Sequence, residues 1–271
     1  VMVSGMSDRG MAKLTNHFER IGLTPVASGG ASAAVMADAD AVRLEPGSAL
    51  CIPFMTGDMM MEGLGTCTEV SGNRVLGFGH SMLAEGSVEL PLATGVVHTV
   101  ISSVWRSNKI GAALQNVGTL LGDENSGIFG LVGKAPAMVP VEVVVRDLRG
   151  EQTYHYNIVH ERFFSPMLLS LAIMESGFAH SDHTVRYALE TEFEDVGTFR
   201  TSNLSSQAGL GAMAMEAAIP ARGLMDTPFG RARLVRARAE FSVEEGARLA
   251  RLDEARLEKS IYKPGEAVRV N

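Results

Sequence analysis

The sequence predicts a mainly β protein with additional helices. Between residue 47 and about residue 160, short apolar runs alternate with turns that contain Gly or Asn, which is typical of antiparallel strands. Glycine makes up 29 of the 271 residues, about 11%, against ~7% in average proteins, and this indicates many turns. We therefore expect a helix-strand segment with a linker at 1–46, an antiparallel β region at 47–160 and an α+β region at 161–271.

The first part is expected to begin with a helix. Ser7 is in the position of an N-cap, and Gly22 is in the position to end the helix. After the strand-like TPV, the segment SGGASAAVMADADA is small and weakly patterned, so we expect a linker there. The helix is expected to carry one apolar stripe, which consists of residues at three- and four-residue spacing: Met11, Leu14, Phe18 and Ile21.

The middle part opens with three apolar runs separated by tight turns. SALCIPFM, MMMEGLGTCTEV and RVLGFG are joined by TGD and SGN, the pattern of an antiparallel meander. Pro53 lies inside the first run. Because proline cannot donate to a strand ladder, it indicates an edge strand or a bulge.

A second hairpin is predicted near the end of this part. PVEVVV and QTYHYNIV flank DLRGE, in which Asp147 and Gly150 are well placed for a turn. In the second strand Tyr154, Tyr156 and Ile158 alternate with polar residues. We therefore expect His155 on the more solvated face.

The last part mixes helical and strand periods. Ser165 and Pro166 open a helix that Gly177 ends, and a second apolar helix from about Gln207 to Ile219 is expected to stop at Pro220. HTVRYALETEF is expected to be a strand, and ARLARLDEARL fits either a helix or a bulged strand. A period of two predicts a strand with one apolar face made of Val235, Ala237, Ala239, Phe241 and Val243.

Composition excludes several classes of function. The formal net charge is −7, and the 24 Lys and Arg residues form no basic stripe, so we expect no nucleic-acid partner. The longest apolar stretch, PMLLSLAIM, is roughly half of the about 20 residues that a membrane span needs. We therefore expect no transmembrane segment. Cys51 and Cys67 lie in apolar runs and are interpreted as buried thiols.

Most polar clusters in the sequence have an ordinary structural explanation. GDENSGIFG matches neither the dinucleotide nor the P-loop pattern. His180, Asp182 and His183 lie close together, but further metal ligands are missing, and the segment reads as a polar loop. We expect neither a metal nor a cofactor. His17 and His98 are interpreted as structural histidines.

Ser7 follows Gly5-Met6 and could therefore be interpreted as a nucleophile. Asp8, Arg9 and a helix come directly after it, and capping of that helix explains this serine better.

His80, in VLGFGHSML, is the strongest candidate for chemistry. It follows a strand, and Gly77 and Gly79 remove side-chain bulk beside it, so the imidazole can be held rigidly and still be reached by a substrate. From the residues alone, packing and proton transfer are equally good explanations of this histidine.

Two longer segments bear on that choice. GLGTCTEVSGNRVLGFGHSM and IGAALQNVGTLLGDENSGIFG resemble the SpoIVB-type serine peptidases, bacterial enzymes grouped with the chymotrypsin-like fold. The shared pattern is G-x-G-T, a short hairpin, a G-H strand end and a later G-D…G-I-F-G run, and it covers residues 63–133. The resemblance implies antiparallel, chymotrypsin-like barrel sheets, and it implies that His80 is the catalytic general base.

The sequence also departs from that family. The nucleophile motif G-M-S-G-S-P and its acidic partner are absent, and the stretch from Val3 to Ser7 resembles instead the opening of this segment in longer relatives. The resemblance therefore implies the histidine-bearing, C-terminal portion of a longer exported protein, periplasmic or in the cell envelope. Its partners would be an upstream serine-bearing part and a peptide or protein substrate. We then expect Val1–Val3 to pack in a strand or against the core, and His80 to face a groove.

The alternative is a catalytically inactive structural or partner-binding module of an exported assembly. A peptidase-like fold can persist after its chemistry is lost, so the fold does not decide between the two functions.

Overall fold

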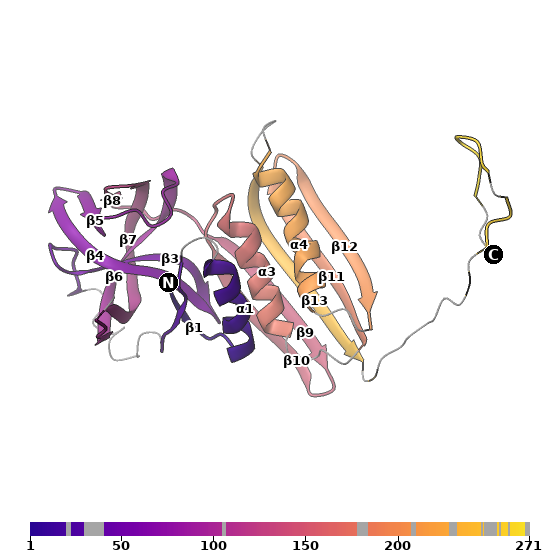
Figure 1. The fold of residues 1–271 in the computed structure, drawn as a ribbon, viewed down its shortest axis with the longest axis horizontal. Helices are drawn as coiled ribbons and strands as arrows, with labels where there is room; N and C mark the ends of the chain where they lie inside the picture. Colours follow the sequence, from indigo (N-terminus) through magenta and orange to yellow (C-terminus); the bar gives the residue numbers. More distant parts are fainter. Residues whose placement is uncertain are drawn as a thin grey trace.

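Thirteen strands form one mixed sheet, and three helices pack with it in the part of the chain that this computed structural model describes (Figure 1). The described residues are 1–19, 23–29, 41–104, 107–177, 184–206, 210–227, 232–244, 246, 254, 256–259 and 261–268. The prediction of a mainly β protein with additional helices is confirmed. No helix within these residues has both the length and the apolarity needed to cross a bilayer.

Six strands close on themselves, and we call them the ring. They are β3 (Ala49–Gly57), β4 (Met60–Ser71), β5 (Arg74–Gly77), β6 (Gly86–Ile101), β7 (Asn108–Glu124) and β8 (Gly127–Val132). Antiparallel pairing runs in the order β3, β6, β7, β8, β5, β4, and β4 pairs back with β3. The ring is not a regular barrel, because β3 and β6 share a short register at Leu50↔Thr94 and Cys51↔Ala93.

The three strands predicted at the start of the ring are confirmed, as is their antiparallel pairing. Pro53 lies at an irregularity in the β3–β4 register, between Pro53 and Met55. Of the two explanations for this proline, the bulge is therefore the right one, since β3 has strand partners on both sides and is not an edge.

Five further strands form a second region, which we call the layer. They are β9 (Val139–Asp147), β10 (Gly150–Ile158), β11 (Thr184–Glu194), β12 (Gly197–Ser205) and β13 (Arg233–Glu244). Their order is β12, β11, β13, β9, β10, and β10 continues onto β3 of the ring. The β13–β9 pair is parallel, whereas the other pairs are antiparallel. Strands from both sides of residue 160 thus share one layer, and the division at 46 and 160 stays a prediction.

Two helices, α3 (Phe164–Gly177) and α4 (Leu210–Met225), cover one face of the layer (Figure 1). Leu168, Ala172 and Ile173 of α3 are buried there. The predicted hairpin of β9 and β10 is confirmed. In β10, His155 is exposed whereas Tyr156 and Ile158 are buried, as the alternation predicts.

The N-terminal segment joins both regions. β1 (Met2–Ser4) pairs with β4 and with β2 (Val26–Ala27), and α1 (Asp8–Phe18) packs against α3. Val3 is buried, as expected of a strand at this position. Leu14 and Phe18 of the predicted stripe are also buried. Ile21, Gly22 and most of the predicted linker lie outside the described residues.

The prediction that the second apolar helix stops at Pro220 is wrong, because α4 continues to Met225 with Pro220 inside it. Proline in a helix interior removes one hydrogen bond and costs about 3 kcal/mol. Ala217, Ala221 and Met225, on either side of the proline, are buried. Burial of the Met225 side chain contributes about 1.5–3 kcal/mol and burial of each alanine methyl group about 0.8 kcal/mol, and together these offset the lost hydrogen bond.

The prediction that Val235 shares the apolar face of its strand is also wrong. Val235 is 41% exposed, while its neighbour Leu234 is buried. The β11–β13 register shifts between Glu192 and Phe193, so β13 carries one extra residue there. An extra residue reverses the alternation on one side of a bulge. Most of ARLARLDEARL lies beyond the described residues.

Candidate functional site

His80 lies three residues after the end of β5, and its side chain is exposed. The chain turns sharply before it, with φ of 68° at Phe78 and 74° at Gly79. The Phe78 amide donates to the Thr66 carbonyl at 2.9 Å, which keeps the start of the turn against β4. The imidazole therefore stands at a strand end and outside the core, as the sequence predicts.

The segment after His80 is anchored by one buried carboxylate. Asp123, at the end of β7, is 1% exposed. Its two oxygens accept the backbone N–H groups of Met82 at 2.6 Å and Leu83 at 2.7 Å. Hydrogen bonds to an ionised acceptor are strong, so this contact holds the loop against the ring.

The imidazole of His80 has one hydrogen-bonding neighbour. Its Nδ1 lies 2.6 Å from the Ser81 carbonyl oxygen. A carbonyl oxygen can only accept, so the contact requires the proton on Nδ1 and leaves the lone pair on Nε2. Within the described residues, no serine hydroxyl and no carboxylate is hydrogen-bonded to this ring. This is the tautomer that a general base requires, but no complete triad is assembled within the described residues.

The other sequence candidates have structural roles or lie elsewhere. The Ser7 side chain accepts the Gly10 N–H at 3.1 Å, which confirms the N-cap interpretation. His98 is exposed on β6. The side chain of His17 and the whole of residues 180–183 lie outside the described residues. The part of the chain that is described has no group of three potential metal ligands.

A buried carboxylate in the ring was missed by the sequence interpretation. Glu62 of β4 is 3% exposed and accepts the Ala113 N–H at 2.8 Å. Removal from water disfavours the charged form, and burial raises the pKa of Glu62 to about 7. Its one sequence signal was a charge inside the apolar run MMMEGLG.

Cys51 lies close to this carboxylate. Burial, and secondarily the neighbouring Glu62, raise the pKa of the Cys51 thiol. Burial likewise raises the pKa of Cys67. Both cysteines are buried and carry free thiols, which confirms their interpretation. A protonated, enclosed thiol is a poor nucleophile.

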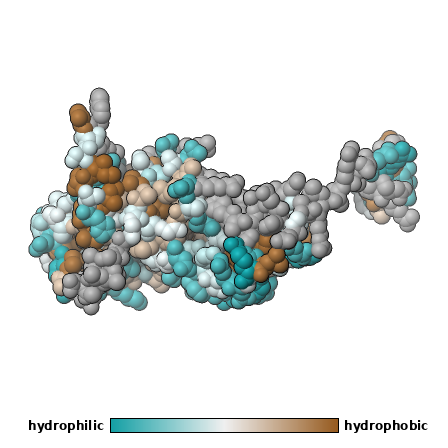
Figure 2. Space-filling model, turned by 90° about the horizontal axis from the view of Figure 1, so that it is seen from below, coloured by the Kyte–Doolittle hydropathy of each residue, from teal (hydrophilic) through white to brown (hydrophobic). Residues whose placement is uncertain are grey.

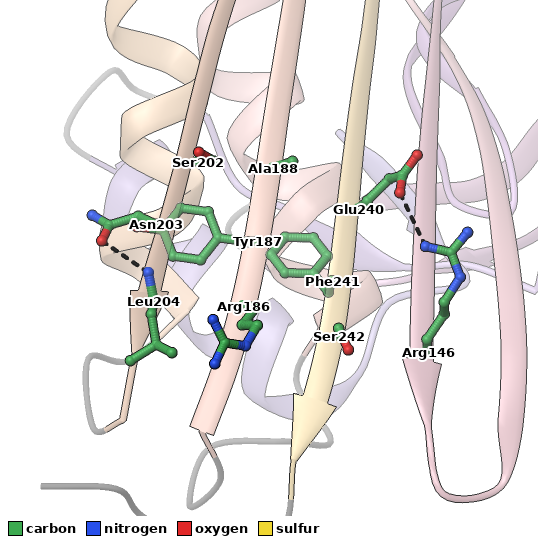
Figure 3. A pocket seen from close by; sticks show the side chains of 10 residues that line it. All are labelled: Arg146, Arg186, Tyr187, Ala188, Ser202, Asn203, Leu204, Glu240, Phe241 and Ser242. Atoms are coloured by element: carbon green, nitrogen blue, oxygen red, sulfur yellow. Dashed lines mark hydrogen bonds and ion pairs between the residues drawn. The ribbon is translucent and has the colours of Figure 1, made fainter.

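The open face of the layer carries a shallow cavity of about 470 Å³ (Figure 3). Arg146 and Arg186 stand beside its small side chains. Arg146 pairs with Glu151 at 2.6 Å and with Glu240 at 3.0 Å, and Arg186 pairs with Glu244 at 3.2 Å. Both guanidinium groups already have counter-ions, so this cavity is a poor anion site. A neighbouring cavity of about 300 Å³ has the same paired character, with Glu190, Arg200 and Arg238.

A larger cavity, of about 600 Å³, lies where the ring meets the layer. His160, half-buried two residues after the end of β10, lines one wall. No sequence signal pointed to this histidine, because the cavity is assembled from segments far apart in the chain. None of these three cavities includes His80, so its exposure is observed but the expected groove is not among them.

Comparison of the chain with protein-family models, with curated proteins and with solved structures gives no match. Function is therefore inferred from the residues and geometry described above.

Proposed function

We propose that this chain supplies the general-base histidine, His80, of a serine endopeptidase whose nucleophilic serine comes from outside this sequence. One observation carries the proposal. The exposed imidazole is held through Nδ1 by the Ser81 carbonyl and presents the Nε2 lone pair. The likeness of residues 63–133 to SpoIVB-type peptidases supports the same role.

The chemistry of this role follows from the tautomer. Nε2 takes the proton of the attacking serine hydroxyl and later returns it to the leaving amine. The Ser81 carbonyl keeps the ring oriented and stabilises the imidazolium, the task that an aspartate performs in a complete triad. In this proposal the ring corresponds to a barrel of a chymotrypsin-like peptidase. The partner is the upstream serine-bearing part of the same exported protein, and the substrate is a peptide or protein.

The proposal is tested with His80→Ala and His80→Gln in the protein that contains the serine-bearing part. Loss of a triad member costs about 10⁴-fold or more in turnover, so peptide cleavage should fall by that order in both variants. The matched control is His155→Ala, which removes an exposed imidazole from the layer and should leave cleavage unchanged. Folding is followed by circular dichroism. Normal cleavage by folded His80→Ala would reject the base role.

A second candidate function is a non-catalytic partner-binding module. Exposed apolar side chains gather at the ring end of the molecule (Figure 2). The β6–β7 hairpin contributes Val97, Val100, Ile101 and Val104, which are 38% to 100% exposed. Apolar surface of this kind marks interaction sites. If this function is the true one, Val100→Asp should abolish association of the chain with its partner, measured by sedimentation. His80→Ala should leave that association unchanged.

A further inference from the structure

The 600 Å³ cavity between the ring and the layer has the walls of a ligand site. Its apolar side chains come from three elements and the segment before β13: Val88 from β6, Leu121 from β7, Met225 from α4, and Ala232. Its polar side chains converge from the loop after His80, from β6 and from the connection between β10 and α3. Apolar walls with a few converging polar groups are typical of small-molecule sites.

One wall presents a polar atom without a partner. The Nε2 atom of His160 is buried and makes no hydrogen bond to any described residue. Burial first, and then the charge of Arg233, lower the pKa of this imidazole, so the ring is neutral at neutral pH. The ring is hydrogen-bonded to its own backbone. That bond raises the pKa of the imidazole, so the ring donates it to the carbonyl from the other nitrogen, Nδ1. The lone pair of the neutral ring is therefore on Nε2, where it can accept from a donor.

The charge of the cavity is negative. Among the described residues, Glu85, Glu89 and Glu161 line it together with the guanidinium of Arg162. Arg233, whose charge acts on His160, lies outside this lining and is paired with Glu194 at 3.9 Å. Glu85 is paired with Arg162 at 3.4 Å. Glu161 accepts the N–H groups of Phe163 and Phe164 at 2.7 and 2.8 Å, at the start of α3.

Glu89 differs from these two carboxylates. It is exposed at the edge of the cavity and lies near His160, and among the described residues it takes part in no hydrogen bond or ion pair. Within the described residues, a carboxylate acceptor and an imidazole acceptor therefore stand in one cavity, and no side-chain donor is bonded to either.

We propose that this cavity binds an alkyl ammonium or alkyl guanidinium group, with Glu89 as its counter-ion and His160 Nε2 as a further acceptor. The apolar walls contact the methylene stem, because long cationic side chains bury the stem and pair the head. The cation is carried either by a Lys or Arg side chain of a peptide or by a free small amine. The site stands independently of the peptidase proposal, since none of its residues is assigned to that chemistry.

Binding is tested by NMR titration of the full chain with three probes of similar length. Nα-acetyl-lysine methylamide carries the cation on a peptide unit, pentane-1,5-diamine carries it without one, and Nα-acetyl-norleucine methylamide has the stem alone. For ligands of this size the dissociation constant should be about millimolar. Amide shifts should be confined to the cavity walls, including Val88 and Ala232. Binding of the lysine probe alone identifies a peptide side chain, and binding of the diamine identifies a free amine.

The variants isolate the two acceptors. Glu89→Gln should weaken binding of the cationic probe about three- to tenfold, and His160→Phe should weaken it about as much. Glu69→Gln is the matched control, because it makes the same change of charge at an exposed carboxylate outside the cavity. The proposal fails if the norleucine probe binds as tightly as the lysine probe, if Glu69→Gln weakens binding as much as Glu89→Gln, or if no cationic probe shifts the cavity amides.

Discussion

The ring and the layer use glycine in different ways. In the ring, a Cβ added at Gly111, Gly118 or Gly130 would lie 2.0–2.5 Å from a backbone carbonyl oxygen of a neighbouring strand. In the layer, a Cβ at Gly150 or Gly197 would meet nothing within 4 Å, and the same holds at Gly223 of α4, the helix that covers the layer. At these three positions, strands of the ring therefore approach more closely than a side chain allows, whereas these glycines of the layer lie at turns and Gly223 lies on the exposed surface of α4. The same residue type is sterically required in the ring and replaceable at Gly223 of α4, which covers the layer.

Charge separates the two regions as well. The ring encloses Glu62, an acidic group that burial holds close to its protonated form. The layer places its charges on the open face of the sheet, where Glu190, Arg236 and Arg238 belong to ladders of ion pairs. Buried charge is costly and exposed pairs contribute little, so the response to pH should reside in the ring.

The largest effect is expected from adding one methyl group to the ring. Gly118→Ala would place a Cβ 2.0 Å from the Leu131 carbonyl oxygen, and the two strands must separate to relieve the overlap. We expect a loss of roughly 3 kcal/mol or more in the free energy of unfolding, measured by urea denaturation. Gly223→Ala, on the exposed side of α4, should instead gain roughly 0.5–1 kcal/mol. Equal effects of the two substitutions would remove the contrast between the regions.

The next effect concerns pH. The folded pKa of Glu62, about 7, lies above the ordinary value of 4.5 for a glutamate, so protonation favours the folded state. The stability that Glu62 contributes is present in full below about pH 4.5 and is lost as the pH rises through about 7, a change of about 3 kcal/mol. Glu62→Gln keeps an oxygen for the Ala113 N–H and removes this dependence.

Urea denaturation at a series of pH values measures the difference between wild type and Glu62→Gln. The variant should match wild type near pH 4.5 and exceed it at pH 8. A constant difference across this range would show that Glu62 does not titrate near neutrality. Glu69→Gln, an exposed carboxylate of the same strand, serves as the control.

The smallest effect is expected on the open face of the layer. Glu190 accepts from Arg200 at 2.7 Å and from Arg236 at 3.2 Å. Glu190→Gln should lower the free energy of unfolding by less than about 1 kcal/mol. Exposed charged side chains are solvated by water whether or not they are paired, so the pairing adds little. The difference should disappear in ~1 M salt, where the screening length is about 3 Å. A cost above 2 kcal/mol that persists in ~1 M salt would show that the ion-pair ladder stabilises the layer as strongly as burial stabilises the ring.

Local patterns predicted the elements that depend on local interactions. The Ser7 cap, the β9–β10 hairpin and the start of α3 follow from residues within a few positions of one another. Capping, turn geometry and alternation act over that range. The exposure of His155 and the position of His80 after β5 were predictable for the same reason.

Local patterns failed where a distant segment changed the balance. Proline at 220 favours the end of a helix, but α4 continues to Met225 because Ala221 and Met225 are buried against the sheet. Val235 keeps the strand period in the sequence, but the register shift opposite Glu192 turns it outward.

The sequence by itself determined the mainly β class, most strand and helix positions, the buried free cysteines and the position of His80 after a strand end. Tertiary structure alone decided the closure of the ring, the parallel β13–β9 pair and the burial of Glu62 under Ala113. It also brought His160 to Glu89 in one cavity. These features join residues tens of positions apart. Their energies come from desolvation and from close approach between strands, which no local window of sequence contains.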